Sequence, residues 1–131
     1  MRDLIAQNNL TTDDLIQPIF IADQSEDKIE IPSMPRIHRH NLDSLYFEVE
    51  SLIKAGIKSV AIFPAIDASK KDEDGSHALD EDNIVCSALA GLSERFPEII
   101  KIADVALDPY TDHGHDGLLM DGRVDNDETV K

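Results

Sequence analysis

The chain has 131 residues and a formal net charge of −15, with 41% hydrophobic and 30% charged residues. This composition is typical of a folded domain and not of a disordered segment. So much negative charge argues against binding to nucleic acid or to an anionic membrane, because both need a basic face. No apolar run approaches the roughly 18 residues of a membrane span, and Cys86 is the only cysteine. We therefore expect a cytoplasmic protein in a reducing compartment.

The first predicted elements are short. Residues Arg2–Asn9 predict a short helix, and Thr11 or Thr12 can cap a further turn. The run Pro18–Ile21 is continuously apolar and rich in β-branched residues, which predicts a strand buried on both faces. A long polar loop is expected to follow it.

A helix is predicted over residues 41–55, because apolar residues recur there at helical spacing. Asn41 is the expected N-cap and Gly56 the expected C-terminal stop. Ser59–Phe63 then predicts a second buried strand, again followed by a polar loop.

The last part of the chain repeats this order. A helix is predicted over residues 82–96 and ends before Pro97. Cys86 falls in its apolar pattern, so we expect a buried small hydrophobic residue and not a nucleophile. Ile99–Leu107 predicts a third strand, and residues 126–131 resemble the capped start of another helix.

Alternating strands and helices predict right-handed βαβ units on a parallel sheet. Both the opening of a (β/α)8 barrel and a doubly wound sheet fit this order. Polar loops after every strand, and the lack of a glycine-rich dinucleotide fingerprint, favour the barrel. We therefore predict an α/β fold that forms the N-terminal portion of a (β/α)8 TIM barrel, with about three strands and their helices. Because a barrel needs about 250 residues, residues 1–131 are expected to be a fragment of a longer single-domain enzyme. Its unpaired strand edges favour self-association.

The densest polar stretch begins in the third predicted strand. Asp104 lies there among apolar residues, where an isolated buried charge is costly. Its carboxylate is therefore either satisfied by backbone donors or functional at the end of the strand. The following loop supplies oxygen and imidazole groups that suit Mg2+ or Zn2+, although such clusters are also ordinary turn material. The candidate ligands are Asp108, Asp112, His113, His115 and Asp116.

Residues 70–81 partly imitate a calcium-binding loop. Lys70, however, occupies the first position, where a carboxylate ligand is required. The preceding residues predict a strand and not the entering helix of an EF-hand. We therefore reject a calcium site in this segment.

Five segments, in order and at matching spacing, carry a resemblance to a known family. They are Ile31–Pro35, Phe63–Pro64, Lys71–Ser76, the run DVALDPYTDHGHDG at 104–117, and Asn126–Val130. Together they resemble the porphobilinogen synthases (5-aminolevulinate dehydratases). The resemblance implies a barrel hydro-lyase of tetrapyrrole (heme) biosynthesis that condenses two 5-aminolevulinate molecules into porphobilinogen, losing two waters. Family members assemble as homo-octamers.

The resemblance also assigns catalytic roles. In the family, two lysines form Schiff bases with the substrates, and both would lie beyond Lys131. No such role is therefore given to Lys54, Lys58, Lys70, Lys71 or Lys101, and this chain alone is expected to be inactive. Asp104 matches a supporting active-site carboxylate near those lysines.

The expected metal preference follows from a difference between this sequence and the zinc-dependent members of the family. Zinc-dependent members carry three cysteines where this sequence has Ala106, Asp108 and Asp116. Without thiolates Zn2+ is not expected, and the resemblance implies the aspartate-rich subclass, which responds to Mg2+ or to monovalent cations. Asp108 and Asp116 are the candidate ligands here, while the main Mg2+ site would lie outside this chain.

The sequence departs from the family elsewhere too. Arg36 stands where glycine is usual, and Asp112 where a small hydroxyl residue is common. Much of the N-terminal arm used for assembly is missing or shortened, which argues against normal assembly of this chain alone. Two rival hypotheses stay open: a stand-alone acidic module that binds divalent cations without catalysis, and the inactive product of a truncated reading frame.

Overall fold

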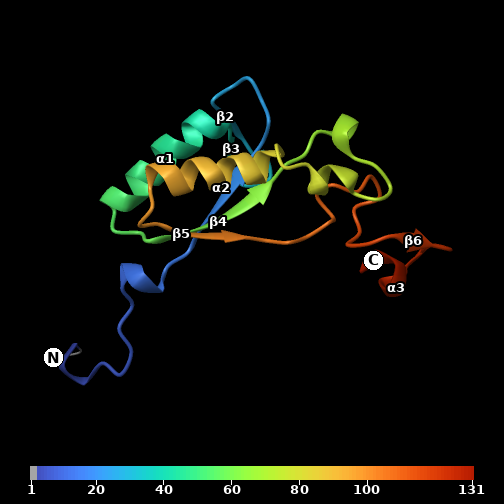
Figure 1. Ribbon diagram of the computed structural model, residues 1–131. Coiled ribbons are helices and arrows are strands. Elements are labelled where there is room, and N and C mark those ends of the chain that lie inside the picture. The colour runs from blue at the N-terminus through green and yellow to red at the C-terminus, as the bar shows by residue number, and fades with distance from the viewer. Residues whose placement is uncertain (1–2) are drawn as a thin grey trace.

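The computed structural model describes residues 3–131 and is built around a five-stranded sheet (Figure 1). The strand order is β2–β3–β1–β4–β5. The strands are β1 (Gln17–Ile21), β2 (Lys28–Glu30), β3 (His38–His40), β4 (Ser59–Pro64) and β5 (Ile100–Ala103). β1, β4 and β5 pair in parallel, β3 pairs in parallel with β1, and β2 pairs antiparallel with β3. The sheet is therefore mixed, and its three predicted strands are confirmed as parallel neighbours.

Two helices, α1 (Leu42–Lys54) and α2 (Ile84–Arg95), cover the same face of the sheet (Figure 1). As predicted, Asn41 caps α1, accepting a hydrogen bond from the N–H of Ser44 at 2.9 Å. Asn83 caps α2 through the N–H groups of Val85 and Cys86, both at 3.0 Å. The buried core between helices and sheet consists of Ile19, Ile21, Leu45, Val49, Val60, Ile62, Ala88, Leu92 and Ile99.

Within residues 3–131, the opposite face of the sheet carries no helix (Figure 1). Strand alternation and register place six apolar residues there: Pro18, Phe20, Ala61, Phe63, Ile100 and Ile102. The rings of Phe20 and Phe63 lie 5.9 Å apart between centroids, and Ile100 is 58% exposed. The expectation that every strand is buried on both faces is wrong for β5, because Ile100 and Ile102 are exposed. Among the described residues β5 also pairs with β4 alone.

The loop expected after β1 instead contains a hairpin formed by β2 and β3. Both strands have only three residues and mostly polar side chains, so no apolar pattern announced them. Between them Arg36 has a φ of +69°, a conformation that favours glycine. Its N–H donates to Glu30 Oε1 at 2.8 Å. This backbone geometry accounts for the glycine that the family resemblance leads one to expect at position 36.

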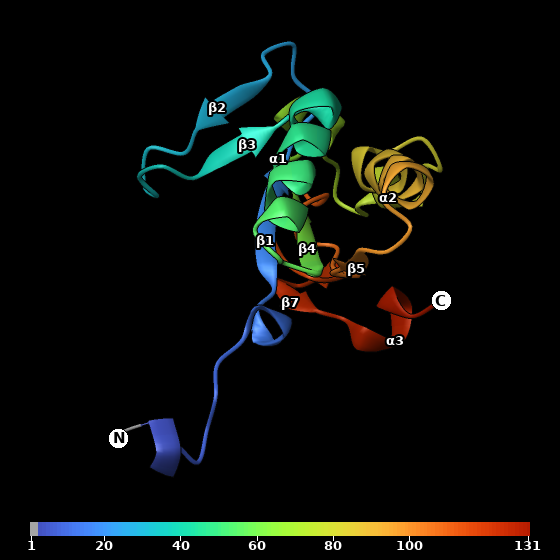
Figure 2. The same ribbon diagram turned by 90° about the vertical axis from the view of Figure 1, so that its left-hand side faces the viewer.

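The N-terminal segment leaves the body of the molecule as an arm (Figure 2). The helix predicted over residues 2–9 is wrong: within its described part only the 3-10 turn η1 (Asp3–Ile5) forms, and Arg2 lies outside the described residues. Leu4 is 87% exposed and Leu10 80% exposed. Because nothing covers these side chains, a helix this short gains no packing energy.

Thr11 caps the next 3-10 turn, η2 (Thr12–Asp14), as one of the two predicted alternatives. The N–H of Thr11 donates to Asp14 Oδ2 at 2.8 Å, and the N–H of Asp13 donates to Thr11 Oγ1 at 3.3 Å. This reciprocal arrangement is a capping box.

Cys86 is exposed, so its predicted burial is wrong. The buried face of α2 runs through Ala88 and Leu92, and Cys86 lies two residues before Ala88, about 200° around the helix. The remaining elements are η3 (Ala68–Lys70), η4 (Ser76–Leu79), β6 (Leu119–Met120), β7 (Arg123–Val124) and α3 (Asn126–Thr129), the helix start expected near the end of the sequence. Within residues 3–131, no helix combines the length and apolarity needed to cross a bilayer.

Replacing Arg36 with glycine is expected to raise the free energy of unfolding by about 0.5–1 kcal/mol, because glycine adopts a positive φ without the clash that a β-carbon creates. Urea denaturation would measure the change. Arg39→Gly is the matched control: Arg39 lies in the extended strand β3, so its replacement is expected to lower stability. An unchanged or lower midpoint for Arg36→Gly would contradict this account.

Candidate functional site

Polar loops gather at one edge of the sheet. Because β1, β4 and β5 are parallel, their carboxyl ends lie at the same edge, where the loops after β4 and β5 also run (Figure 1). Functional groups of β/α proteins are concentrated at this edge. The candidate site is therefore sought among the residues that follow the three strands.

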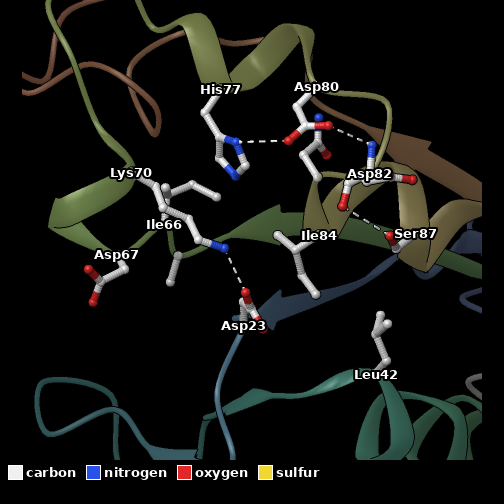
Figure 3. A pocket seen from close by; sticks show the side chains of 12 residues that line it. Asp23, Leu42, Ile66, Asp67, Lys70, His77, Asp80, Asp82, Ile84 and Ser87 are labelled. Atoms are coloured by element: carbon white, nitrogen blue, oxygen red, sulfur yellow. Dashed lines mark hydrogen bonds and ion pairs between the residues drawn. The ribbon is translucent and has the colours of Figure 1, made fainter.

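A cavity of about 200 Å³ opens between the ends of β1 and β4 and the start of α2 (Figure 3). Across it, Lys70 Nζ lies 2.7 Å from Asp23 Oδ2. On its other side, His77 Nδ1 lies 3.5 Å from Asp80 Oδ2. Asp23 was missed by the sequence analysis, although its place two residues beyond a buried strand was a usable signal.

The ion pair has a chemical consequence for Lys70. Hydrogen bonding to the Asp23 carboxylate, reinforced by its charge, raises the pKa of Lys70 above its usual value. The amine therefore stays protonated at neutral pH. A Schiff-base lysine must be neutral to attack a carbonyl, and the expectation that Lys70 has no such role stays a prediction.

Asp104 lies just beyond the carboxyl end of β5 and not inside the strand. β5 ends at Ala103, and Asp104 and the following Val105 are both exposed. The prediction of a strand reaching Leu107 is therefore wrong, and the Asp104 carboxylate needs no buried partner. Its position at the carboxyl end of β5 agrees with the expected location, while its supporting role in catalysis stays a prediction.

Asp116 ties the start of the β5 loop to its end. Its Oδ1 accepts hydrogen bonds from the N–H of Leu107 at 2.5 Å and of Asp108 at 3.0 Å. Inside the loop, the hydroxyl of Thr111 donates to the carbonyl of His115 at 3.0 Å, and Thr111 is only 1% exposed. The two candidate metal ligands thus lie close together in a loop closed by hydrogen bonds.

The other candidate ligands do not join them. His113 Nε2 lies 3.1 Å from the carbonyl oxygen of Glu73, and its ring stacks on His115 with centroids 5.6 Å apart. In the part of the chain that the structure describes, no three His, Cys, Asp or Glu side chains converge closely enough to hold a metal ion. The structure thus brings Asp108 and Asp116 together without the other candidates, and their role as metal ligands stays a prediction.

The loops after β4 and β5 are joined by a parallel bridge between Asp72 and Thr111, here called the clasp. The N–H of Asp72 donates to the carbonyl of Tyr110 at 3.3 Å, and the N–H of Asp112 donates to the carbonyl of Asp72 at 2.9 Å. The Asp72 carboxylate meanwhile accepts from the N–H of Ser76 at 2.9 Å and from the Ser76 hydroxyl. The segment that resembles a calcium loop is thus held by hydrogen bonds within the protein, from the Asp72 carboxylate and from the bridge to Thr111.

Tyr110 connects the clasp to the cavity and was also missed from the sequence. Its ring packs edge-on against the ring of His77 at 6.1 Å between centroids, and it is 6% exposed. Burial raises the pKa of Tyr110, so the phenol stays neutral at physiological pH. An aromatic residue in an otherwise polar loop was the available signal.

The hydrogen bonds from Ser76 hold the pKa of Asp72 below its usual range. Their contribution to stability is therefore complete above the unfolded carboxyl pKa of about 3.9 and is lost as the pH falls through the lower folded value. We expect the Ser76 amide resonance to shift with a midpoint below about pH 3.9 in an NMR titration. Asp72→Asn is the control, because it removes the titrating carboxylate. A Ser76 midpoint above the ordinary carboxyl value would refute the assignment.

Comparison with known proteins gives the family. Residues 1–131 match the family described as delta-aminolevulinic acid dehydratase. The dehydratase of Bradyrhizobium diazoefficiens is 46% identical over 129 residues, covering 98% of this chain and 36% of that protein. Its counterpart in Chlamydia pneumoniae is 43% identical, with coverage of 100% and 40%.

The similarity extends to three-dimensional structure. A crystal structure of delta-aminolevulinic acid dehydratase (porphobilinogen synthase) from Toxoplasma gondii ME49, in complex with the reaction product porphobilinogen, matches with a TM-score of 0.94 and 37% identity. The match covers 98% of this chain and 37% of that one. The chain therefore spans 36–40% of the length of these relatives, corresponding to their N-terminal part. It belongs to the delta-aminolevulinic acid dehydratase family.

Proposed function

We propose that the complete protein is a porphobilinogen synthase, a hydro-lyase that condenses two 5-aminolevulinate molecules into porphobilinogen with loss of two waters. The observation that carries this proposal is the carboxylate rim, Asp104 followed by the Asp108–Asp116 loop. It lies at the carboxyl ends of parallel strands, in a chain that matches a porphobilinogen-bound relative. The reaction belongs to tetrapyrrole (heme) biosynthesis, in the cytoplasm.

The uncovered face of the sheet supports a partial barrel. β1, β4 and β5 follow one another across the sheet in one direction, and both connecting helices lie on the same side. A doubly wound sheet reverses direction and places helices on both faces, whereas a barrel winds one way. The apolar face that includes Phe20, Phe63 and Ile102 would line the barrel interior, and the free edge of β5 would pair with the next strand.

The residues of this chain prepare the site without supplying its nucleophile. Lys70 forms an ion pair with Asp23 across the cavity, and the resemblance to the family assigns the Schiff-base lysines to the part of the enzyme outside residues 1–131. Imine formation makes the substrate carbon more electrophilic and easier to deprotonate. The exposed carboxylate of Asp104, at the end of β5, holds the ammonium or iminium charge that develops beside it. This chain alone is therefore inactive.

Asp108 and Asp116 take part in binding a hard cation, Mg2+ or a monovalent ion. Carboxylate oxygens are the donors such ions prefer, and no thiolate is available in the loop for zinc. One oxygen of Asp116 is engaged by backbone N–H groups, which leaves the other for a ligand. The further donors, and the main Mg2+ site, belong to the rest of the enzyme.

The complete protein forms a homo-oligomer, an octamer as in its family. The projecting arm supports this, because Leu4, Ile5 and Leu10 are at least 76% exposed and need a covering surface. A stand-alone cation-binding module is supported less well, since no three-ligand cluster forms within residues 3–131. No structural observation favours an inactive truncated product.

Joining residues 1–131 to the C-terminal part of the Bradyrhizobium diazoefficiens relative is expected to produce a hybrid that forms porphobilinogen from 5-aminolevulinate. Colour development with 4-dimethylaminobenzaldehyde would measure the product. Asp104→Asn, which keeps size but removes charge, is expected to lower kcat on the order of 10²-fold. Each part alone serves as control, and a folded hybrid that forms no porphobilinogen would contradict the proposal.

In that hybrid, Asp108→Asn is expected to raise the Mg2+ concentration for half-maximal activity at least about tenfold, because a charged oxygen ligand becomes neutral. Asp121→Asn is the matched control, since Asp121 is an exposed residue of the β6–β7 turn. Calorimetric titration with Mg2+ and Zn2+ tests the metal preference. Tight, preferred zinc binding would overturn the subclass assignment.

A further inference from the structure

The clasp depends on the side chain of Asp72 as well as on its backbone. The carboxylate accepts hydrogen bonds from the N–H groups of Asp74, at 3.2 Å, and Ser76, at 2.9 Å. The Ser76 hydroxyl donates to the other carboxylate oxygen. These bonds fold residues 72–76 into a compact turn around Asp72.

The turn lies directly on the β5 loop. Gly75, with a φ of +65°, is packed so that a β-carbon there would lie 3.4 Å from both Leu107 Cδ2 and Thr111 Cγ2. Asp72 thus fixes a turn whose surface contacts the first part of the β5 loop, while its own backbone pairs beside Thr111.

Thr111 passes this restraint to the rim. Its buried hydroxyl donates to the carbonyl of His115, the residue before Asp116. Asp116 in turn accepts from the N–H groups of Leu107 and Asp108. Hydrogen bonds, joined by the Asp72 backbone and by the packing contacts of Gly75, therefore lead from the Asp72 carboxylate to the backbone that carries both candidate cation ligands.

We propose that Asp72 is a positioning residue, whose carboxylate holds the clasp and through it presents Asp108 and Asp116 at the rim. The cation-binding role of Asp108 and Asp116 rests on the proposed function. The positioning of these residues by Asp72 is a property of residues 1–131 alone. Asp72 itself contacts neither substrate nor cation. Asp72 lies in the loop after β4 and restrains the loop after β5.

The physical need for such a residue follows from charge and entropy. The β5 loop carries several carboxylates that repel one another, and each backbone residue held in one conformation costs about 1–2 kcal/mol in entropy. A loop ordered before a ligand arrives leaves less of that cost to the binding step. The clasp provides this order from a neighbouring loop without using a cation.

Amide hydrogen exchange on this chain tests the positioning directly. Asp72→Ala is expected to increase exchange about tenfold at Asp112 and at Leu107 and Asp108, as loss of charge-assisted hydrogen bonds predicts. The last two N–H groups donate to Asp116 and not to Asp72, so a purely local effect would leave them unchanged. Asp74→Ala removes the same charge from the same turn, yet keeps the N–H that bonds Asp72, and is expected to stay within about twofold of the original chain.

Asp72→Asn keeps an acceptor oxygen for the Ser76 N–H and is expected to restore part of the protection, so that exchange increases less than in Asp72→Ala. If Asp72→Ala does not fold, Asp72→Asn and Ser76→Ala still decide, with an intermediate increase at Leu107 and Asp108 expected for both. Unchanged exchange at Leu107 and Asp108 in every Asp72 variant that folds, and in Ser76→Ala, overturns the proposal. So does an equal increase in Asp74→Ala.

The hybrid enzyme separates this inference from the proposed function. There, Asp72→Ala is expected to raise the half-activating Mg2+ concentration while Asp74→Ala leaves it unchanged, at equal thermal midpoints. A hybrid that is inactive with every variant refutes the proposed function, and exchange on the chain alone still decides the role of Asp72. An active hybrid in which Asp72→Ala leaves the half-activating Mg2+ concentration unchanged refutes the positioning role.

Discussion

Burial of the sheet on one face only is the constraint on which the remaining structure depends. Right-handed crossovers between parallel neighbours place α1 and α2 on the same side, because β1, β4 and β5 follow one direction across the sheet. The core therefore forms between helices and sheet, and it includes Val60 and Ile62 of β4. The same geometry brings all three carboxyl ends to one edge. Fold and rim are thus consequences of a single winding direction.

The large negative charge serves the conformation of the loops. Asp14, Asp67, Asp72, Asp116 and Asp125 each accept a hydrogen bond from a backbone N–H in their own turn or loop. Short turns and helix starts leave such donors without partners, and a nearby carboxylate satisfies them and favours the local dipole. Part of the acidity thus stabilises irregular backbone.

The features that sequence predicted best are those set by local interactions. Asn41 and Thr11 were identifiable as caps because a cap and its N–H partners lie within three residues of each other. Burial in the helices was predicted less well, as Cys86 shows. The apolar residues of α2 cover a broad arc, and sequence alone does not say which part of it faces the sheet.

The features that sequence missed depend on distant contacts. The β2–β3 hairpin is held by pairing with β1 and not by an apolar pattern of its own. The clasp joins Asp72 to Thr111, and neither residue type announces a bridge across two loops. Likewise β5 ends at Ala103, which pairs with Ile62, although β4 continues to Pro64, so the apolar pattern of the sequence does not show where the pairing stops. Asp104, which was predicted to lie in a buried strand, is therefore found exposed beyond its end.

The chemistry of the rim follows from which of its charges are already satisfied. Asp116 gives one oxygen to backbone N–H groups, and this fixes the carboxylate without neutralising it. Asp104 is exposed and remains able to face a positive charge. Carboxylates held in place before a ligand arrives stabilise cations, ammonium groups and iminium ions, and they would repel a phosphate or a developing oxyanion. The rim can therefore hold cationic groups, which is what the roles proposed for Asp104 and Asp116 require.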